Sequence, residues 1–157
     1  MKKKLLTVVA LMALVMIPTF AKSSDMSAGL AVGTINGVGF KYKVDKDITA
    51  GGTVGFDVFS GTINVEGFGL YKVAEVDVQK EVIDINVGLG GAARIPLSSS
   101  DVFGLSVLGM GEASYSFDGD LPIDLLLRLE PGVGMTFSGG FNAAFVMQAS
   151  LQALWRF

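Results

Sequence analysis

The chain has 157 residues, half of them hydrophobic, with 12 basic residues, 15 acidic residues, no histidine and no cysteine. Without cysteine there are no disulfides, thiolate metal sites or lipoprotein anchor, and without histidine there are no Ser-His-Asp triads, His-based acid–base catalysts or imidazole metal ligands. We therefore expect neither an enzyme nor a cofactor, and the excess of acidic residues argues against nucleic acid as a partner.

The N-terminal residues predict a secretory signal peptide. The basic start MKKK precedes the apolar run LLTVVALMALVMI, and Thr19-Phe20-Ala21 supplies small residues for a signal peptidase. The run is shorter than the roughly 20 residues of a membrane-spanning helix, although a start helix that anchors the chain is an alternative. Cleavage after Ala21 would separate a signal peptide, 1–21, from one mature domain, 22–157. The mature domain would then contain nine basic and 15 acidic residues, which gives a net charge of about −6.

Eight segments of the mature chain alternate between apolar and polar residues, which predicts β-strands. They are 28–35, 39–44, 48–58, 62–76, 80–95, 103–117, 121–137 and 141–157, and the breaks between them are rich in Gly, Asn, Asp, Ser and Pro. No segment has convincing helical periodicity. Short connections favour an up-and-down antiparallel meander, and such a sheet avoids exposed edges by closing into a barrel.

The parity of each loop predicts which residues share a face. An Asn-Gly turn at 36–37 would point Leu30 inward, so we expect an odd-length loop around 36–38 instead. Pro131-Gly132 interrupts an otherwise regular strand, and a β-bulge is expected there because proline cannot donate to a ladder. The Gly-rich stretches at 50–52 and 88–91 suit a tightly curved small barrel. One face is then almost wholly apolar, with charge only near turns, at Glu75 and Glu81.

The opposite face carries charges of both signs in equal number. They are Lys41, Lys43, Asp57, Glu66, Lys72, Asp84, Arg94, Glu112, Asp124, Arg128, Glu130 and Arg156. The apolar face is too large for the interior of an eight-stranded barrel, which is just wide enough for side chains. We therefore predict a barrel with lipid outside and paired charges in its lumen, where Asp124 and Glu130 pair with Arg128, Arg94 or Arg156. The alternative is a soluble barrel with these charges on a solvated surface.

The aromatic residues support the same orientation. Tyr42, Tyr71, Tyr115 and Trp155 are all the Tyr and Trp residues of the chain. They fall on the apolar face toward the side where both chain ends lie, and such amphipathic rings suit a membrane–water interface. The opposite rim is predicted to carry Phe40, Phe103, Phe137 and Phe141. Aromatic girdles around an apolar band are typical of transmembrane barrels.

The last segment, FNAAFVMQASLQALWRF, alternates evenly and ends on Phe157. It resembles the assembly signal of bacterial outer-membrane barrels, which would correspond to Leu151, Trp155 and Phe157. The whole mature chain resembles the small eight-stranded OmpA/OmpX-type group, and GLAVGTINGVGFKYKV and IDLLLRLEPGVGM resemble stretches of other small barrels. The resemblance implies the outer membrane of a diderm bacterium, outer-membrane lipid as surroundings and a barrel-assembly machine as partner. Long outer loops, common in that group, are absent except at 96–102.

Three functions follow as hypotheses. The first is a non-enzymatic, monomeric barrel that supports the integrity of the cell envelope and has a filled lumen. The second is a narrow pore for small solutes or ions, which needs a gap between the lumenal charges. The third is a surface binder or adhesin of unknown ligand, for which segment 96–102 is the candidate because binding usually resides in loops.

Overall fold

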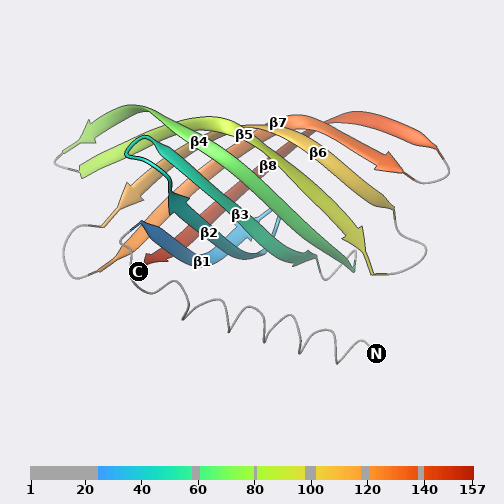
Figure 1. Cartoon of the computed structure of the whole chain (residues 1–157), viewed down its shortest axis with the longest axis horizontal. Coiled ribbons are helices and arrows are strands. Elements are labelled where there is room, and N and C mark those ends of the chain that lie inside the picture. Colours follow the sequence, from blue (N-terminus) through green and yellow to red (C-terminus); the bar gives the residue numbers. More distant parts are fainter. Residues whose placement is uncertain (1–24, 58–60, 80, 98–101, 118–120, 138–139) are drawn as a thin grey trace.

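A computed structural model describes residues 25–57, 61–79, 81–97, 102–117, 121–137 and 140–157, and within them the fold is all-β (Figure 1). The strands are β1 (Met26–Gly33), β2 (Gly37–Lys43), β3 (Ile48–Asp57), β4 (Thr62–Val78), β5 (Glu81–Pro96), β6 (Phe103–Ser116), β7 (Ile123–Phe137) and β8 (Phe141–Arg156). The predicted signal peptide and its cleavage site lie outside the described residues. Among the described residues, no helix has the length and apolar character needed to cross a membrane.

The eight strands form a closed, antiparallel, up-and-down barrel, as the sequence predicted. Each strand pairs with the next one along the chain, and β8 pairs with β1 through Ser27–Arg156 and its neighbours. When paired residues are followed from strand to strand, a path that starts at Ala28 on β1 arrives at Phe145 on β8. Where the barrel closes, however, Ala28 pairs with Trp155, ten residues further along β8. Such a stagger is what closing a sheet of tilted strands requires.

The two ends of the barrel differ in length and content. Phe157, Asp25 and the turn at 44–47 lie at one end, here called the terminal end (Figure 1). The opposite, distal end carries the short loop 34–36 and the ends of β3, β5 and β7. The β1–β2 hairpin is short, whereas β4 to β8 are 14 to 17 residues long. The wall is therefore lower around β1 and β2 than around the rest of the barrel.

All eight predicted strands are present, and each observed boundary lies within two residues of its prediction. The predicted odd-length first loop is confirmed, but at 34–36, because Ala31 pairs with Gly37. At the distal end of β7, Phe137 pairs with Phe141, the first residue of β8. β3 and β4 remain in register to their shared distal end, where Asp57 pairs with Thr62.

Two local predictions were wrong, namely a bulge at Pro131 and an outward-facing Glu75. No bulge occurs at Pro131. The β6–β7 ladder has no pairs at Gly109 and Met110, but its register is the same on both sides of this gap, because a proline removes a donor without inserting a residue. The bulge lies instead in β4, between Lys72 and Ala74. A bulge reverses the alternation beyond it, so Glu75 lies opposite Asp84 on the inner face rather than on the outer one.

The outer face of the barrel is apolar on every strand. Leu30 on β1, Leu89 on β5 and Phe145 on β8 have exposed fractions of 67%, 71% and 72%. Leu30 is thus on the outer face, as the parity of the first loop predicted. A monomer in water rarely exposes a continuous apolar surface of this extent.

Two glycines allow large side chains to fill the lumen. A Cβ atom on Gly51 would lie 2.6 Å from the ring of Phe68, and one on Gly90 would overlap the methyl group of Met110. Outward-facing Gly67, in contrast, has open space where a Cβ would be. The interpretation of the Gly-rich stretches as places that need little bulk is confirmed at Gly51 and Gly90.

Candidate functional site: a buried ion cluster in the lumen

The centre of the lumen holds a cluster of buried charges around Arg128, whose exposed fraction is 0%. Its Nε and Nη2 atoms both donate to Oε2 of Glu112, at 3.0 and 2.7 Å, and its Nη1 donates to Oε1 of Glu66 at 3.1 Å. Oε1 of Glu130 lies 3.6 Å from the same Nη1. Lys41 completes the cluster, with Nζ donating to Oε1 of Glu112 at 2.6 Å.

These contacts cross the barrel rather than run along its wall. Arg128 stands on β7, whereas Glu66 stands on β4, three strands away around the barrel. Lys41 on β2 likewise reaches Glu112 on β6. Pairs between strands that are not neighbours in the sheet can only meet through the interior. These five charged side chains therefore point into the lumen, as predicted.

An aromatic ring and a second polar layer support the cluster. The ring of Phe68 lies 3.8 Å from Cζ of Arg128, a cation–π contact within a desolvated site. Asn86 donates to both Oε1 of Glu112 and Oγ of Ser114, at 3.3 and 3.2 Å. Buried charges are tolerated when they are paired and hydrogen-bonded in this way. The cluster is thus a cross-link between β2, β4, β6 and β7.

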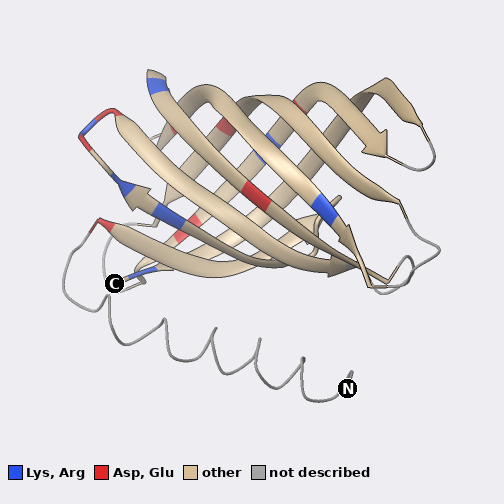
Figure 2. Ribbon diagram, turned by 45° about the vertical axis from the view of Figure 1, so that its right-hand side comes forward, with Lys and Arg blue, Asp and Glu red and all other residues tan. Residues whose placement is uncertain are grey.

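Charged residues at the terminal end form separate pairs. Lys72 donates to Oε1 of Glu75 at 2.6 Å and lies 3.6 Å from Asp84, so the bulge in β4 supplies a partner that the sequence placed outside. Nε of Arg156 lies 3.2 Å from Oδ1 of Asp124. The expected pairings of Glu130 with Arg128 and of Asp124 with Arg156 are confirmed. Figure 2 shows the charged positions mostly in the terminal half and middle of the barrel.

The remaining predicted lumen charges do not join either group. Lys43 lines a small cavity of about 80 Å³ at the terminal end, together with the Lys72 and Arg156 pairs. Arg94 lies at the distal end, is exposed, and has no ion pair or hydrogen bond with a described residue. The side chain of Asp57 lies outside the described part of the structure. The twelve predicted charges therefore do not make one continuous network.

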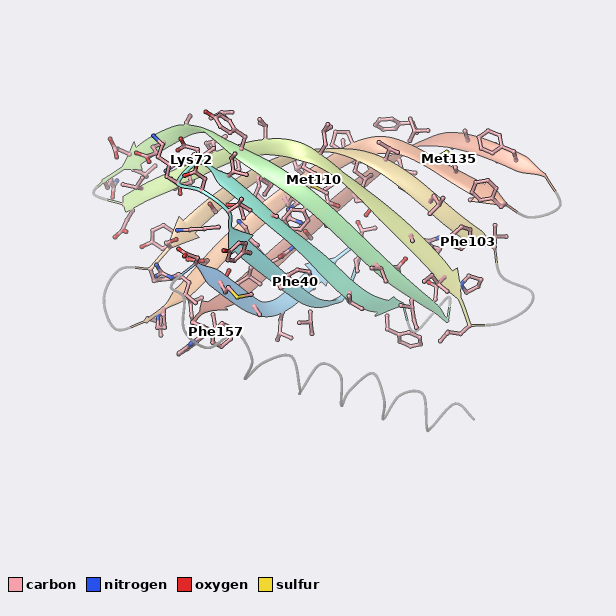
Figure 3. The ribbon with its side chains drawn as sticks, in the orientation of Figure 1. Phe40, Lys72, Phe103, Met110, Met135 and Phe157 are labelled. Carbon is pink, nitrogen blue, oxygen red and sulfur yellow. The ribbon has the colours of Figure 1, made fainter. Side chains whose placement is uncertain are left out.

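The apolar half of the lumen was missed by the sequence analysis. Phe68, Leu70, Leu108 and Met110 form a buried cluster inside the barrel, and Leu126 and Leu154 are 1% and 0% exposed. Met110 points inward near the middle of the barrel (Figure 3). All six residues are an even number of positions away from an inward-facing charge on the same strand, and this alternation could have predicted their inward orientation. The charge cluster is thus embedded in apolar packing, and this cross-section of the lumen is filled.

The predicted interface aromatics lie on the outer face toward the terminal end. Tyr42, Tyr71 and Trp155 are 44%, 54% and 47% exposed. Tyr115 is half-buried, because its ring packs edge-on against Phe117 at 4.8 Å and its hydroxyl donates to Glu81. The three residues of the predicted assembly signal, Leu151, Trp155 and Phe157, are also outward and exposed.

The predicted phenylalanine rim at the distal end contains three of its four members. Phe137 contacts Phe103 and Phe141, with ring centroids 6.1 and 5.8 Å apart. Phe40 lies instead in the middle of the short β2, where it covers Gly52 (Figure 3). Strand alternation gave its face correctly, but the length of the β1–β2 hairpin decided its height.

The described residues hold no group of three or more potential metal ligands. Comparison with protein-family models, curated proteins and solved structures gives no match for this chain.

Proposed function

We propose that the protein is a non-enzymatic outer-membrane barrel whose role is structural, as a rigid cylinder with a closed lumen that supports the cell envelope. The observation that carries the proposal is the fully buried Arg128 cluster, which joins four strands across the lumen and is packed against apolar side chains. Such a centre contributes rigidity, because buried and fully packed groups rarely leave their positions.

The apolar outer face supports a location of the barrel in a membrane. Outward aliphatic and aromatic side chains occur on all eight strands, and each outward row continues toward both ends of its strand. Apart from residues 141–148 of β8, which pair with β7 alone, the ladders close around the barrel, and backbone groups satisfied by neighbouring strands are the condition for spanning hydrocarbon with strands. Tyr and Trp at one end and Phe at the other suit two different interfaces.

The pore alternative has less support than the structural role. A distal cavity of about 210 Å³ and the terminal cavity of about 80 Å³ flank the Arg128 cluster. Conduction would require the ion pairs and the packed Leu108 and Leu126 to move apart together. The proposal therefore includes a barrel that does not conduct in its resting state.

Refolding of the mature chain into lipid vesicles tests the membrane assignment. We expect compact migration on gels without boiling and slower migration after boiling, with β-sheet circular dichroism only when lipid is present. The same preparation in planar bilayers tests the closed lumen, and silent membranes are expected. A folded protein in lipid-free buffer would overturn the membrane role, whereas steady single-channel steps would favour the pore.

A further inference from the structure

The distal cavity is a recess with an apolar floor and a cation at its rim. Ala92 and Val146, which line it, pack against the buried cluster of Phe68 and Met110. Ile35, at the tip of the 34–36 loop, is only 7% exposed and forms part of the wall. Apolar walls with a few polar groups are characteristic of sites for small organic ligands.

The recess is lined by inward-facing residues of β8 from Asn142 to Gln148. Paired neighbours run from Arg94 through Gly104 and Thr136 to Asn142, and because of the stagger of the barrel this row rises toward the distal end from β5 to β8. Gln148, which also lines the cavity, lies six residues deeper on β8, about 20 Å along a strand. Oε1 of Gln148 is buried and accepts no hydrogen bond from the described residues. The lining of the recess along β8 therefore has polar groups at Asn142 and Gln148 and the apolar Val146 between them.

Size and charge restrict the occupant. The volume of about 210 Å³ exceeds the ~150 Å³ that suffices for benzene in an apolar cavity. Arg94 has no anionic partner among the described residues, and a guanidinium binds a carboxylate through two parallel hydrogen bonds. A ligand with one ring or a short acyl chain and one carboxylate matches both features.

We propose that this cavity is a binding site for a small apolar carboxylate. The carboxylate lies on Arg94, and the apolar body lies against Ile35, Ala92 and Val146. The proposal goes beyond the structural role, and it rests on the lumen of the barrel rather than on the membrane around it.

One wall of the cavity also offers a side route for such a ligand. β8 pairs with β1 only from Ser150 to Arg156, and Thr34 adds a hydrogen bond to Ala149. Residues 141–148 of β8 therefore pair with β7 alone, and Asn142, Ala144 and Val146 of this segment line the cavity. The cavity thus lacks a continuous hydrogen-bonded wall on the side of the short β1–β2 hairpin. If the barrel lies in a membrane, an amphiphile can approach from the lipid through this side.

Calorimetric titration of the refolded, nanodisc-embedded protein tests the site, with empty discs as the reference for partitioning. The probes are phenylacetate, neutral phenylacetamide and cationic phenethylamine, which share one ring and differ in charge. We expect saturable, one-site binding of phenylacetate, binding of the amide about tenfold weaker, and none of the amine. Heat equal to that of empty discs, or equal affinity for all three probes, would overturn the proposal.

Two pairs of variants locate the binding. Arg94→Gln should weaken phenylacetate about tenfold and abolish the preference over the amide, whereas Arg94→Lys should retain part of it. Ala144→Phe should fill the cavity and abolish binding, whereas Ala143→Phe, on the neighbouring outward-facing residue, should leave it unchanged. Heat-modifiable gel migration confirms that each variant is folded. Because Arg94 is exposed at the rim, the outcome for Arg94→Gln decides the question even if Ala144→Phe does not fold; undiminished binding there removes the site.

Discussion

Arg128 on β7 and Glu112 on β6 are direct cross-strand neighbours, and two guanidinium nitrogens of Arg128 donate to one carboxylate oxygen of Glu112. The other oxygen of Glu112 accepts from Lys41, on the opposite side of the lumen. Glu112 thus receives a cation on each oxygen while it is 2% exposed. The pair is the fixed centre around which Glu66, Glu130 and Phe68 are arranged.

Replacement of Arg128 by methionine should strongly destabilise the folded barrel. The variant would leave Glu66 and Glu130 buried without a cation, and removal of one partner from a buried ion pair costs about 3–5 kcal/mol. The measurement is urea-dependent unfolding from lipid vesicles, followed by the fluorescence of Trp155. As a control, Arg94→Met removes a cation that has no partner among the described residues, and it should change stability by less than about 0.5 kcal/mol. Equal effects of both variants would contradict the role of the cluster.

An arginine at Leu127 tests the outer face. Leu127 is 54% exposed in the middle of β7, and a charge there costs about 2–4 kcal/mol at a bilayer midplane. Leu121→Arg, at the terminal end, should cost only about 0–1 kcal/mol, because charged groups near an interface reach water. Equilibrium folding into vesicles of defined thickness measures both. A neutral Leu127→Arg would mean that this face does not contact hydrocarbon.

Valine at Gly51 tests the packing of the lumen. Its Cβ would meet both the backbone oxygen of Phe40 and the ring of Phe68, which is held by Arg128, so the cost should be about 1–3 kcal/mol from overpacking. Gly67→Val is the matched control, since its side chain would enter open space on the outer face and raise the strand propensity. The difference between the two unfolding free energies is the observable. A tolerated Gly51→Val would indicate a lumen with spare room.

Trp155 reports the depth of the terminal end. It is the single tryptophan of the chain, points outward and is 47% exposed. In vesicles its emission should shift to shorter wavelength, and lipids brominated near the head group should quench it more than lipids brominated near the chain terminus. Stronger quenching from the bilayer centre would place the terminal end too deep for an interfacial girdle.

Much of the wall of the barrel could be predicted from the sequence. Strand alternation is a local property with a period of two residues, so segments such as 141–157 reveal both their length and their two faces. The parity of short loops then carries the assignment from strand to strand, which is why Leu30 was correctly placed outside despite the Asn-Gly signal. This reasoning fails where a bulge adds one residue to a strand, as in β4, because no residue pattern around Lys72 predicts the bulge.

The side-chain contacts within the lumen depend on tertiary structure more than the wall of the barrel does. The sequence by itself determined the number of strands, their order and the face of the cluster charges such as Arg128, because these follow from local periodicity and loop length; Glu75, beyond the β4 bulge, is the exception. Only the closed structure decided that Lys41 meets Glu112, 71 residues away, that Arg94 stays unpaired among the described residues, and that Phe68 lies under Arg128. The reason is geometric: contacts across the lumen depend on the stagger accumulated around all eight strands, and no single segment encodes that sum.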